Sequence, residues 1–76
     1  LEERIAACRK HLYGSVKWKG EKLGILEMRR HYANYLKGLS HIKDFRSKLV
    51  TTDSINQIDD ILEEIIAHYT NLATAV

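Results

Sequence analysis

Arg30, Asn34 and Lys37 recur at intervals of four and three residues in the middle of the chain. At 100° per residue, this spacing places the three side chains on one face of a helix. Such a face presents two cations and an amide to a partner, and Lys19 and Lys22 lie close by in the sequence. The pattern favours binding of a polyanion over an ordinary solvated face, which is the alternative.

Other kinds of chemistry find little support in the sequence. A metal site needs several converging ligands, and only two pairs occur at helical spacing, Glu27 with His31 and Glu64 with His68. The single cysteine, Cys8, lies on an apolar stripe, where a buried and unreactive thiol is expected. The four glycines are scattered, so they form no phosphate-binding loop. We therefore expect no metal site and nominate no catalytic residue.

Helical periodicity runs through the chain and proline is absent, so the sequence predicts an all-α fold. We expect a small bundle of four helices, at about 2–19, 19–38, 40–49 and 53–72. The second helix, bracketed by Gly20 and Gly38, carries the polar face described above. Gly24 inside it offers room for the close approach of another helix. An apolar stripe on its other side is expected to enter the core: Ile25, Met28, Tyr32, Tyr35 and Leu36.

The other helices supply the rest of the predicted core. The first has the stripe Ile5, Cys8, Leu12 and Val16, the third Ile42, Phe45 and Leu49, and the last Ile55, Ile58, Ile61, Leu62, Ile65, Ile66, Tyr69 and Leu72. On the first helix, Lys10, Tyr13 and Lys17 line up on a flanking face. We favour a solvated face with a half-buried tyrosine there, and a contact with a phosphate backbone is the alternative. Trp18 is expected to anchor the second helix rather than to stack on a base.

Charge is distributed unevenly along the chain. The net charge is only +2, but residues 1–50 hold all 12 Lys and Arg against five acidic residues, a balance of +7. Residues 51–76 hold five acidic residues and no Lys or Arg, a balance of −5. This asymmetry predicts an anion-binding side and an opposite, acidic side formed by the last helix, which would repel a phosphate backbone. Ordinary solubility charge is the alternative explanation.

Length and composition bound the rest. Seventy-six residues make one small domain, too short for a cofactor-binding α/β domain with its own cleft. No apolar run approaches the roughly 20 residues that span a bilayer. The chain begins at Leu1, inside a predicted helix, and we expect it to be a piece of a longer protein. One cysteine allows no internal disulfide and fits a reducing, cytoplasmic setting.

Residues 27–39, EMRRHYANYLKGL, carry a motif. It resembles the C-terminal helical domain of the bacterial flavin-dependent tRNA-dihydrouridine synthases, which reads roughly E-M-R-K-H, two variable residues, W-Y, one more residue, and K-G. The matching positions are Glu27, Met28, Arg29, His31, Tyr35, Lys37 and Gly38, and Arg30 is a like-charged substitute. Asn34 stands where many relatives carry Trp, and Ser40 where they carry Pro. The likeness covers essentially the whole chain, with KGE at 19–21, a basic segment at 45–46 and a final acidic helix in the expected order.

The resemblance implies a parent oxidoreductase with an N-terminal TIM barrel that is absent from this chain. That barrel binds FMN, takes reducing equivalents from NADPH and reduces the C5–C6 bond of uridines in tRNA. Its general acid is a barrel cysteine, a role that Cys8 does not have. For residues 1–76 the resemblance implies tRNA docking, in contact with the barrel and without a cofactor. It assigns phosphate or ribose contacts to Arg29, Arg30, Asn34 and Lys37, and a supporting positive rim to Lys19, Lys22, Lys43 and Arg46.

Two other classes of function remain open. The chain could be a protein-interaction bundle without RNA binding, because the apolar stripes of four helices need not all be satisfied within it. It could also be a small all-helical enzyme whose Arg and Lys grip a carboxylate substrate, as in chorismate-mutase-like bundles.

Overall fold

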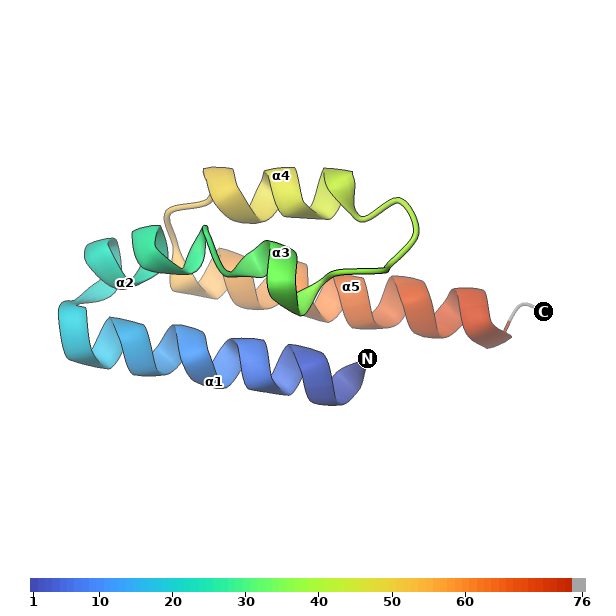
Figure 1. Cartoon of the computed structure of the whole chain (residues 1–76), viewed down its shortest axis with the longest axis horizontal. Helices are drawn as coiled ribbons and strands as arrows, with labels where there is room; N and C mark the ends of the chain where they lie inside the picture. Colours follow the sequence, from blue (N-terminus) through green and yellow to red (C-terminus); the bar gives the residue numbers. More distant parts are fainter. Residues whose placement is uncertain (75–76) are drawn as a thin grey trace.

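The computed structural model describes the backbone of residues 1–74 and the side chains of residues 1–71, and over this range the chain is all-helical (Figure 1). The described helices are α1 (Glu2–Lys19), α2 (Glu21–Met28), α3 (Tyr32–Tyr35), α4 (Lys43–Thr51) and α5 (Ile55–Thr74). The predicted all-α class is confirmed. In the same range, no helix is both long enough and apolar enough to cross a bilayer.

The first hairpin is formed by α1 and α2, which double back at Gly20 (Figure 1). Gly20 has φ 90°, a left-handed conformation that glycine adopts readily, and its N–H donates to the carbonyl oxygen of Val16 at 2.8 Å. Gly24 then lies directly against α1, because a Cβ added there would come 2.6 Å from the Cα of Val16. The predicted close helix approach at Gly24 is confirmed.

The prediction of one helix over residues 19–38 is wrong. The chain leaves α2 after Met28, makes a turn over 29–31, and forms only the four residues of α3 before a second turn. In the first turn the N–H of Arg29 donates to Leu26 at 3.3 Å and that of His31 to Met28 at 2.9 Å, a three-residue spacing that tightens the coil. Distant groups hold both turns, because Arg29 donates to Asp53 and a guanidinium from α1 donates to two carbonyl groups, one at the last residue of α3 and one in the turn after it.

That guanidinium belongs to Arg4. It donates to the backbone oxygens of Tyr35 and Lys37, so these carbonyls need no further helical turn. Gly38, with φ 87°, then turns the chain toward α4. Helix α4 begins at Lys43, three residues later than predicted, and packs on α5.

The core lies where the described helices pack together, and it follows the predicted apolar stripes. Its buried members come from all five described helices and, for Leu36, from the turn after α3: Ile5, Cys8, Leu12, Ile25, Met28, Tyr32, Leu36, Leu49, Ile58, Ile61, Leu62 and Ile65. Other predicted members, including Val16, Tyr35, Phe45 and Tyr69, are half-buried at its edge. Leu72, the last residue of the predicted stripe on α5, lies outside the described side chains.

Trp18 does not join this core, and its predicted role as an anchor for the second helix is wrong. Its side chain is 85% exposed. The reason is geometric: α2 packs with the backbone of Gly24 on Val16, and Trp18 lies about 200° around α1 from Val16. The indole therefore projects away from the contact between the two helices.

Candidate nucleic-acid interface

Three of the four acidic side chains of α5 make ion pairs, so the acidic side that the sequence predicted is partly neutralised. Arg9 of α1 donates from Nε to Oδ1 of Asp59 at 2.9 Å and from Nη2 to Oε1 of Glu63 at 2.8 Å. Tyr13 donates its hydroxyl to the same Asp59, and this hydrogen bond raises the pKa of the tyrosine. The Nζ of Lys48 lies 3.7 Å from the Glu64 carboxylate. Cations of α1 and α4 thus neutralise much of α5.

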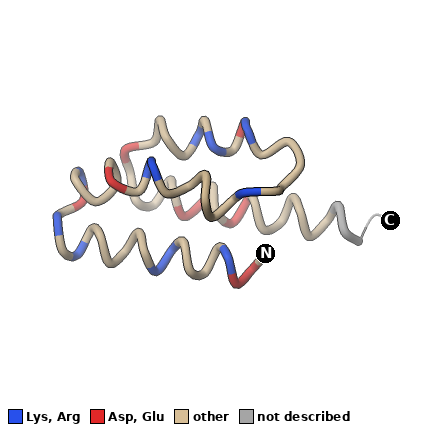
Figure 2. Tube along the Cα trace, in the orientation of Figure 1, with Lys and Arg blue, Asp and Glu red and all other residues tan. Residues whose placement is uncertain are grey.

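Figure 2 shows lysines and arginines along α1, α2, the α3 region and α4, whereas α5 carries only acidic charges in its described part. Four of these cations make ion pairs: Arg9, Lys19, Arg29 and Lys48. Within the described side chains, seven others are exposed and make no ion pair: Lys10, Lys17, Lys22, Arg30, Lys37, Lys43 and Arg46. Five of these seven lie between residues 22 and 46, so this stretch keeps its charge available.

Arg30, Asn34 and Lys37 are all exposed, as predicted. They belong to three different pieces of backbone, because Arg30 lies in the turn after α2, Asn34 on α3, and Lys37 in the next turn. Their common exposure survives the break in the predicted helix because the buried residues Met28 and Tyr32 keep a four-residue spacing across it. All three side chains are therefore exposed although the helix is interrupted.

Lys19 and Arg29 are less available than the other predicted contacts. Lys19 pairs with Glu27 across the α1–α2 hairpin, and its hydrogen bond lowers the pKa of that carboxyl group. Arg29 donates from Nη2 to Oδ1 of Asp53 at 2.9 Å, while its Nε is buried without a hydrogen-bond partner. Both cations are engaged in ion pairs within the fold, and helical periodicity alone does not predict either pair.

The predicted rim residues on α2 and α4 are free. Lys22 is exposed on α2, and Lys43 and Arg46 are exposed one turn apart on α4. Lys48, further along α4, is held differently, because its Nζ lies 5.5 Å from the centre of the Phe45 ring and near the Glu64 carboxylate. Lys43 and Arg46, in the first half of α4, are thus accessible to an anion, whereas Lys48 in the second half is already paired.

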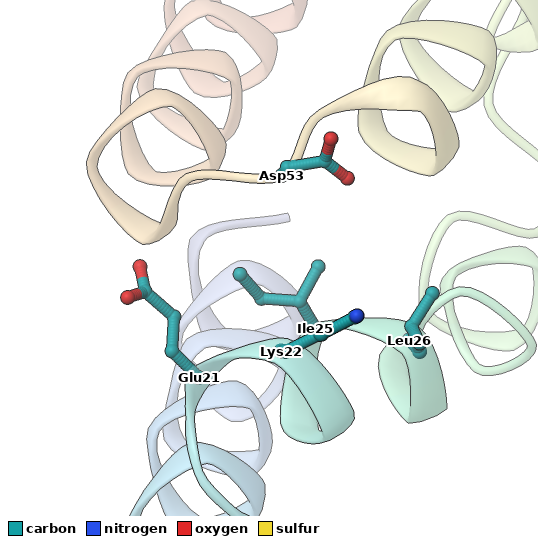
Figure 3. Close-up of a pocket in the computed structure, with 5 residues that line it drawn as sticks. All are labelled: Glu21, Lys22, Ile25, Leu26 and Asp53. Carbon is teal, nitrogen blue, oxygen red and sulfur yellow. The ribbon is translucent and has the colours of Figure 1, made fainter.

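Beside Lys22 a recess of about 350 Å³ opens between α2 and the connection from α4 to α5 (Figure 3). Its walls are Glu21, Lys22, Ile25, Leu26 and Asp53. Both carboxylates are already engaged, because Glu21 accepts a hydrogen bond from the N–H of Ile55 at 3.3 Å and Asp53 holds Arg29. The recess combines an apolar wall with two partnered carboxylates and the unpaired Lys22, and we assign it no ligand.

His11 and His31 form a contact that the sequence did not suggest. Their ring centres lie 4.7 Å apart, and Nδ1 of His11 is 3.0 Å from the hydroxyl oxygen of Tyr35. The sequence spacing of Glu27 and His31 allows the two to pair on one helix, but in the structure the Glu27 carboxylate forms its ion pair with Lys19. Within the described residues, no group of three or more His, Cys, Asp or Glu gathers where it could hold a metal ion. This cluster therefore joins α1 to α3 as a packing contact.

Cys8 is fully buried, as predicted. Removal from water destabilises the thiolate and raises the pKa of the thiol to about 11. A thiol in this state ionises very little at neutral pH and is a poor nucleophile.

No family model matches the chain, and no solved structure matches it. The observations that bear on function are therefore the exposed cations, the paired carboxylates of α5 and the motif of residues 27–39.

Proposed function

We propose that this chain is the tRNA-binding helical domain of a tRNA-dihydrouridine synthase. In such an enzyme an N-terminal TIM barrel binds FMN and uses NADPH to reduce uridines of tRNA to 5,6-dihydrouridine. The helical domain docks the tRNA against the barrel so that the target uridine reaches the flavin. The chain itself holds the RNA and carries no catalytic residue.

The proposal depends above all on one observation: five of the six cations of residues 22–46, all but Arg29, are exposed and lack carboxylate partners, whereas three of the four acids of α5 are paired. Unpaired like charges repel one another, and a phosphate backbone relieves that repulsion while it releases its own counterions. Arg30 and Lys37 lie within the stretch that resembles the synthase motif. Location and motif thus support the same ligand.

Backbone contact is the mode of recognition that these residues suit. Lysine and arginine side chains on a convex helical surface reach phosphates and riboses, which fix the register of a folded RNA without reading its sequence. If Arg30, Lys37, Lys43 and Arg46 each neutralise one phosphate, a plot of the logarithm of affinity against the logarithm of salt concentration should have a slope of about −2.8 to −3.6. Specificity for one uridine then comes from how the domain and the barrel position the tRNA together.

Paired substitutions of equal net charge test the proposal. Arg30→Gln with Lys37→Gln removes two positive charges from the proposed interface. Asn56→Asp with Gln57→Glu lowers the net charge by the same two units at exposed positions of α5. We expect the first variant to bind a tRNA transcript about tenfold more weakly or worse, with a salt slope shallower by about 1.4 to 1.8. The second variant should bind nearly as well as the wild type.

Filter binding across about 50 to 200 mM salt measures both quantities. Circular dichroism confirms that each variant remains helical. Equal losses in the two variants would show a response to net charge alone, and unchanged affinity in the first would reject the interface.

A protein-interaction bundle without RNA binding is the second candidate, and exposed apolar side chains on α2 favour it. Leu23 is 59% exposed and Leu26 is 43% exposed. The double variant Leu23→Ser, Leu26→Ser should no longer bind a partner that covers this face. Light scattering of the wild type would then show self-association that the variant lacks, and the wild type would not bind tRNA.

A further inference from the structure

Trp18 is the only tryptophan of the chain, and among the large apolar side chains of residues 1–71 it is the most exposed. Tryptophan is among the most deeply buried residue types on average, because its large ring gains much from leaving water. Here the indole lies outside the core, and no described ring stacks on it. An aromatic face is therefore presented to solvent at the end of α1.

Gly14, one turn earlier on α1, leaves space beside that indole. A residue four positions before another lies on the same helix face, and helical side chains lean back over the preceding turn. Gly14 is exposed, and a Cβ added there would meet no atom within 4 Å. A glycine inside a helix costs about 1 kcal/mol relative to alanine. Packing gives no reason for this one, and it leaves the position one turn before Trp18 without a side chain.

The backbone beneath the indole is held firmly. Two hydrogen bonds close the corner after α1, from Gly20 N–H to Val16 at 2.8 Å and from Gly24 N–H to Gly20 at 2.9 Å. Gly24 also packs directly on Val16. A tryptophan on such a support has only two side-chain torsions to order, so the entropic cost of using it as a contact is low.

Cations flank this position on both sides in the sequence. Lys17 precedes Trp18 directly, and Lys22 follows it just after the corner, on α2. Both are exposed and unpaired within the described side chains, unlike Lys19, which holds Glu27. An exposed aromatic side chain with a free lysine before and after it in the sequence suits a nucleotide, whose base can stack while its neighbouring phosphates contact the lysines. An uncharged apolar partner would gain nothing from those lysines.

We infer that Trp18 is a stacking platform for one unpaired base of the bound RNA, with Lys17 and Lys22 contacting the phosphates on either side of that nucleotide. The inference rests on the proposed function, since it presupposes that the chain binds RNA. It adds the class of RNA element involved, namely a nucleotide in a loop, a bulge or a single-stranded end rather than a paired one.

The sole tryptophan makes the test specific, because its fluorescence reports on this position alone. An oligouridylate and a fully paired RNA duplex with the same number of phosphates serve as the two probes. We expect the oligouridylate to quench Trp18 emission at saturation and the duplex to bind with little quenching. Trp18→Ala should weaken oligouridylate binding by about fivefold or more and change duplex binding much less.

Two further substitutions at Trp18 separate stacking from general hydrophobic contact. Trp18→Phe keeps an aromatic face and should retain most of the affinity for oligouridylate. Trp18→Leu keeps an apolar side chain without a ring and should behave like Trp18→Ala. If Trp18→Leu binds oligouridylate as tightly as the wild type, stacking is excluded. Trp18 is largely outside the core, so all three variants should fold, and circular dichroism checks that they do.

Gly14 provides a matched pair that leaves Trp18 itself unchanged. Gly14→Ala adds one carbon in open space and should preserve oligouridylate binding. Gly14→Leu covers the approach to the indole and should weaken binding in the same direction as Trp18→Ala. Equal affinities for the two Gly14 variants would contradict a role for the open position one turn before Trp18.

Anisotropy of a labelled tRNA separates the failure of this inference from that of the proposed function. If the wild-type chain does not bind tRNA, the proposed function fails and the stacking role fails with it. If the wild type and Trp18→Ala bind tRNA equally well and emission does not change, the stacking role alone is overturned.

Discussion

Gly14 and Gly24 both lie inside helices of the α1–α2 hairpin, but they face opposite surroundings. At Gly24 a Cβ would come within 2.6 to 2.8 Å of the backbone of α1, whereas at Gly14 it would meet nothing within 4 Å. One glycine is required because two backbones touch, and the other has no packing reason. Packing therefore requires a glycine on the inner side of the hairpin, at position 24, and does not require one on the outer side, at position 14.

Arg9 and Arg30 show the same contrast in charge. Arg9 holds Asp59 and Glu63 across the α1–α5 contact, whereas Arg30 is exposed in the turn after α2 without a carboxylate partner. A guanidinium that spans two carboxylates stabilises the fold. A free one contributes little to the fold and keeps its charge for a ligand. Inner and outer surfaces therefore use the same residue types for different purposes.

Gly24→Ala should have the largest effect on stability. The added carbon must displace the backbone of Val16 rather than a flexible side chain, so we expect a loss of about 2 kcal/mol or more. Thermal unfolding should then shift down by about 8 °C or more for a domain of this size. An unchanged melting temperature would mean that the hairpin can open at no cost, and the distinction between the two glycines would fail.

Gly14→Ala should act in the opposite direction. The site is open and helical, so the substitution removes the conformational cost of glycine and should raise stability by about 1 kcal/mol. Chemical denaturation measures this gain from the shift in midpoint at constant slope. A loss of stability would reveal a packing role for Gly14 and weaken the case for an open outer face.

Arg9→Ala and Arg30→Ala should produce crossed effects. Arg9→Ala leaves Asp59 and Glu63 unpaired, and because these groups are partly exposed we expect a loss of only about 1 kcal/mol. Arg30→Ala should change stability by less than about 0.5 kcal/mol. Affinity for tRNA should respond in the reverse order, with Arg30→Ala weakening binding and Arg9→Ala leaving it nearly unchanged. If the two variants lost stability to the same extent and tRNA affinity to the same extent, the distinction between the inner and outer surfaces would be contradicted.

Acid pH should produce the smallest effect, at the Lys19–Glu27 pair. The hydrogen bond from Lys19 lowers the folded-state pKa of Glu27, so this pair stabilises the fold above the ordinary carboxyl pKa of about 4.3. The contribution is lost as the pH falls through the lowered value. The wild type should therefore be slightly more stable than Glu27→Gln at neutral pH, with the difference vanishing in strong acid. A difference that persists in acid would have a cause other than the charge on Glu27.

Much of the fold could be predicted from the sequence, because helical periodicity is a local property. Apolar residues spaced three and four apart place α1 and α5 and identify nearly all of the buried residues on them. Glycine at 20 and 38 marks two corners for the same reason, since each position has a backbone conformation that other residues rarely adopt. Exposure of Arg30, Asn34 and Lys37 likewise follows from the buried stripe opposite them.

Tertiary structure alone decided where the predicted second helix breaks and which charges remain free. Arg4 donates hydrogen bonds to carbonyl groups 31 and 33 residues away in the sequence, and Arg9 pairs with Asp59, which is 50 residues away. No local pattern encodes such partners, because they depend on how the hairpins dock. The exposure of Trp18 has the same origin: the contact of Gly24 with Val16 sets the orientation of α1, and the indole is left on the outer side. Sequence thus determined the faces of the helices, and packing determined which groups on those faces were left for a ligand.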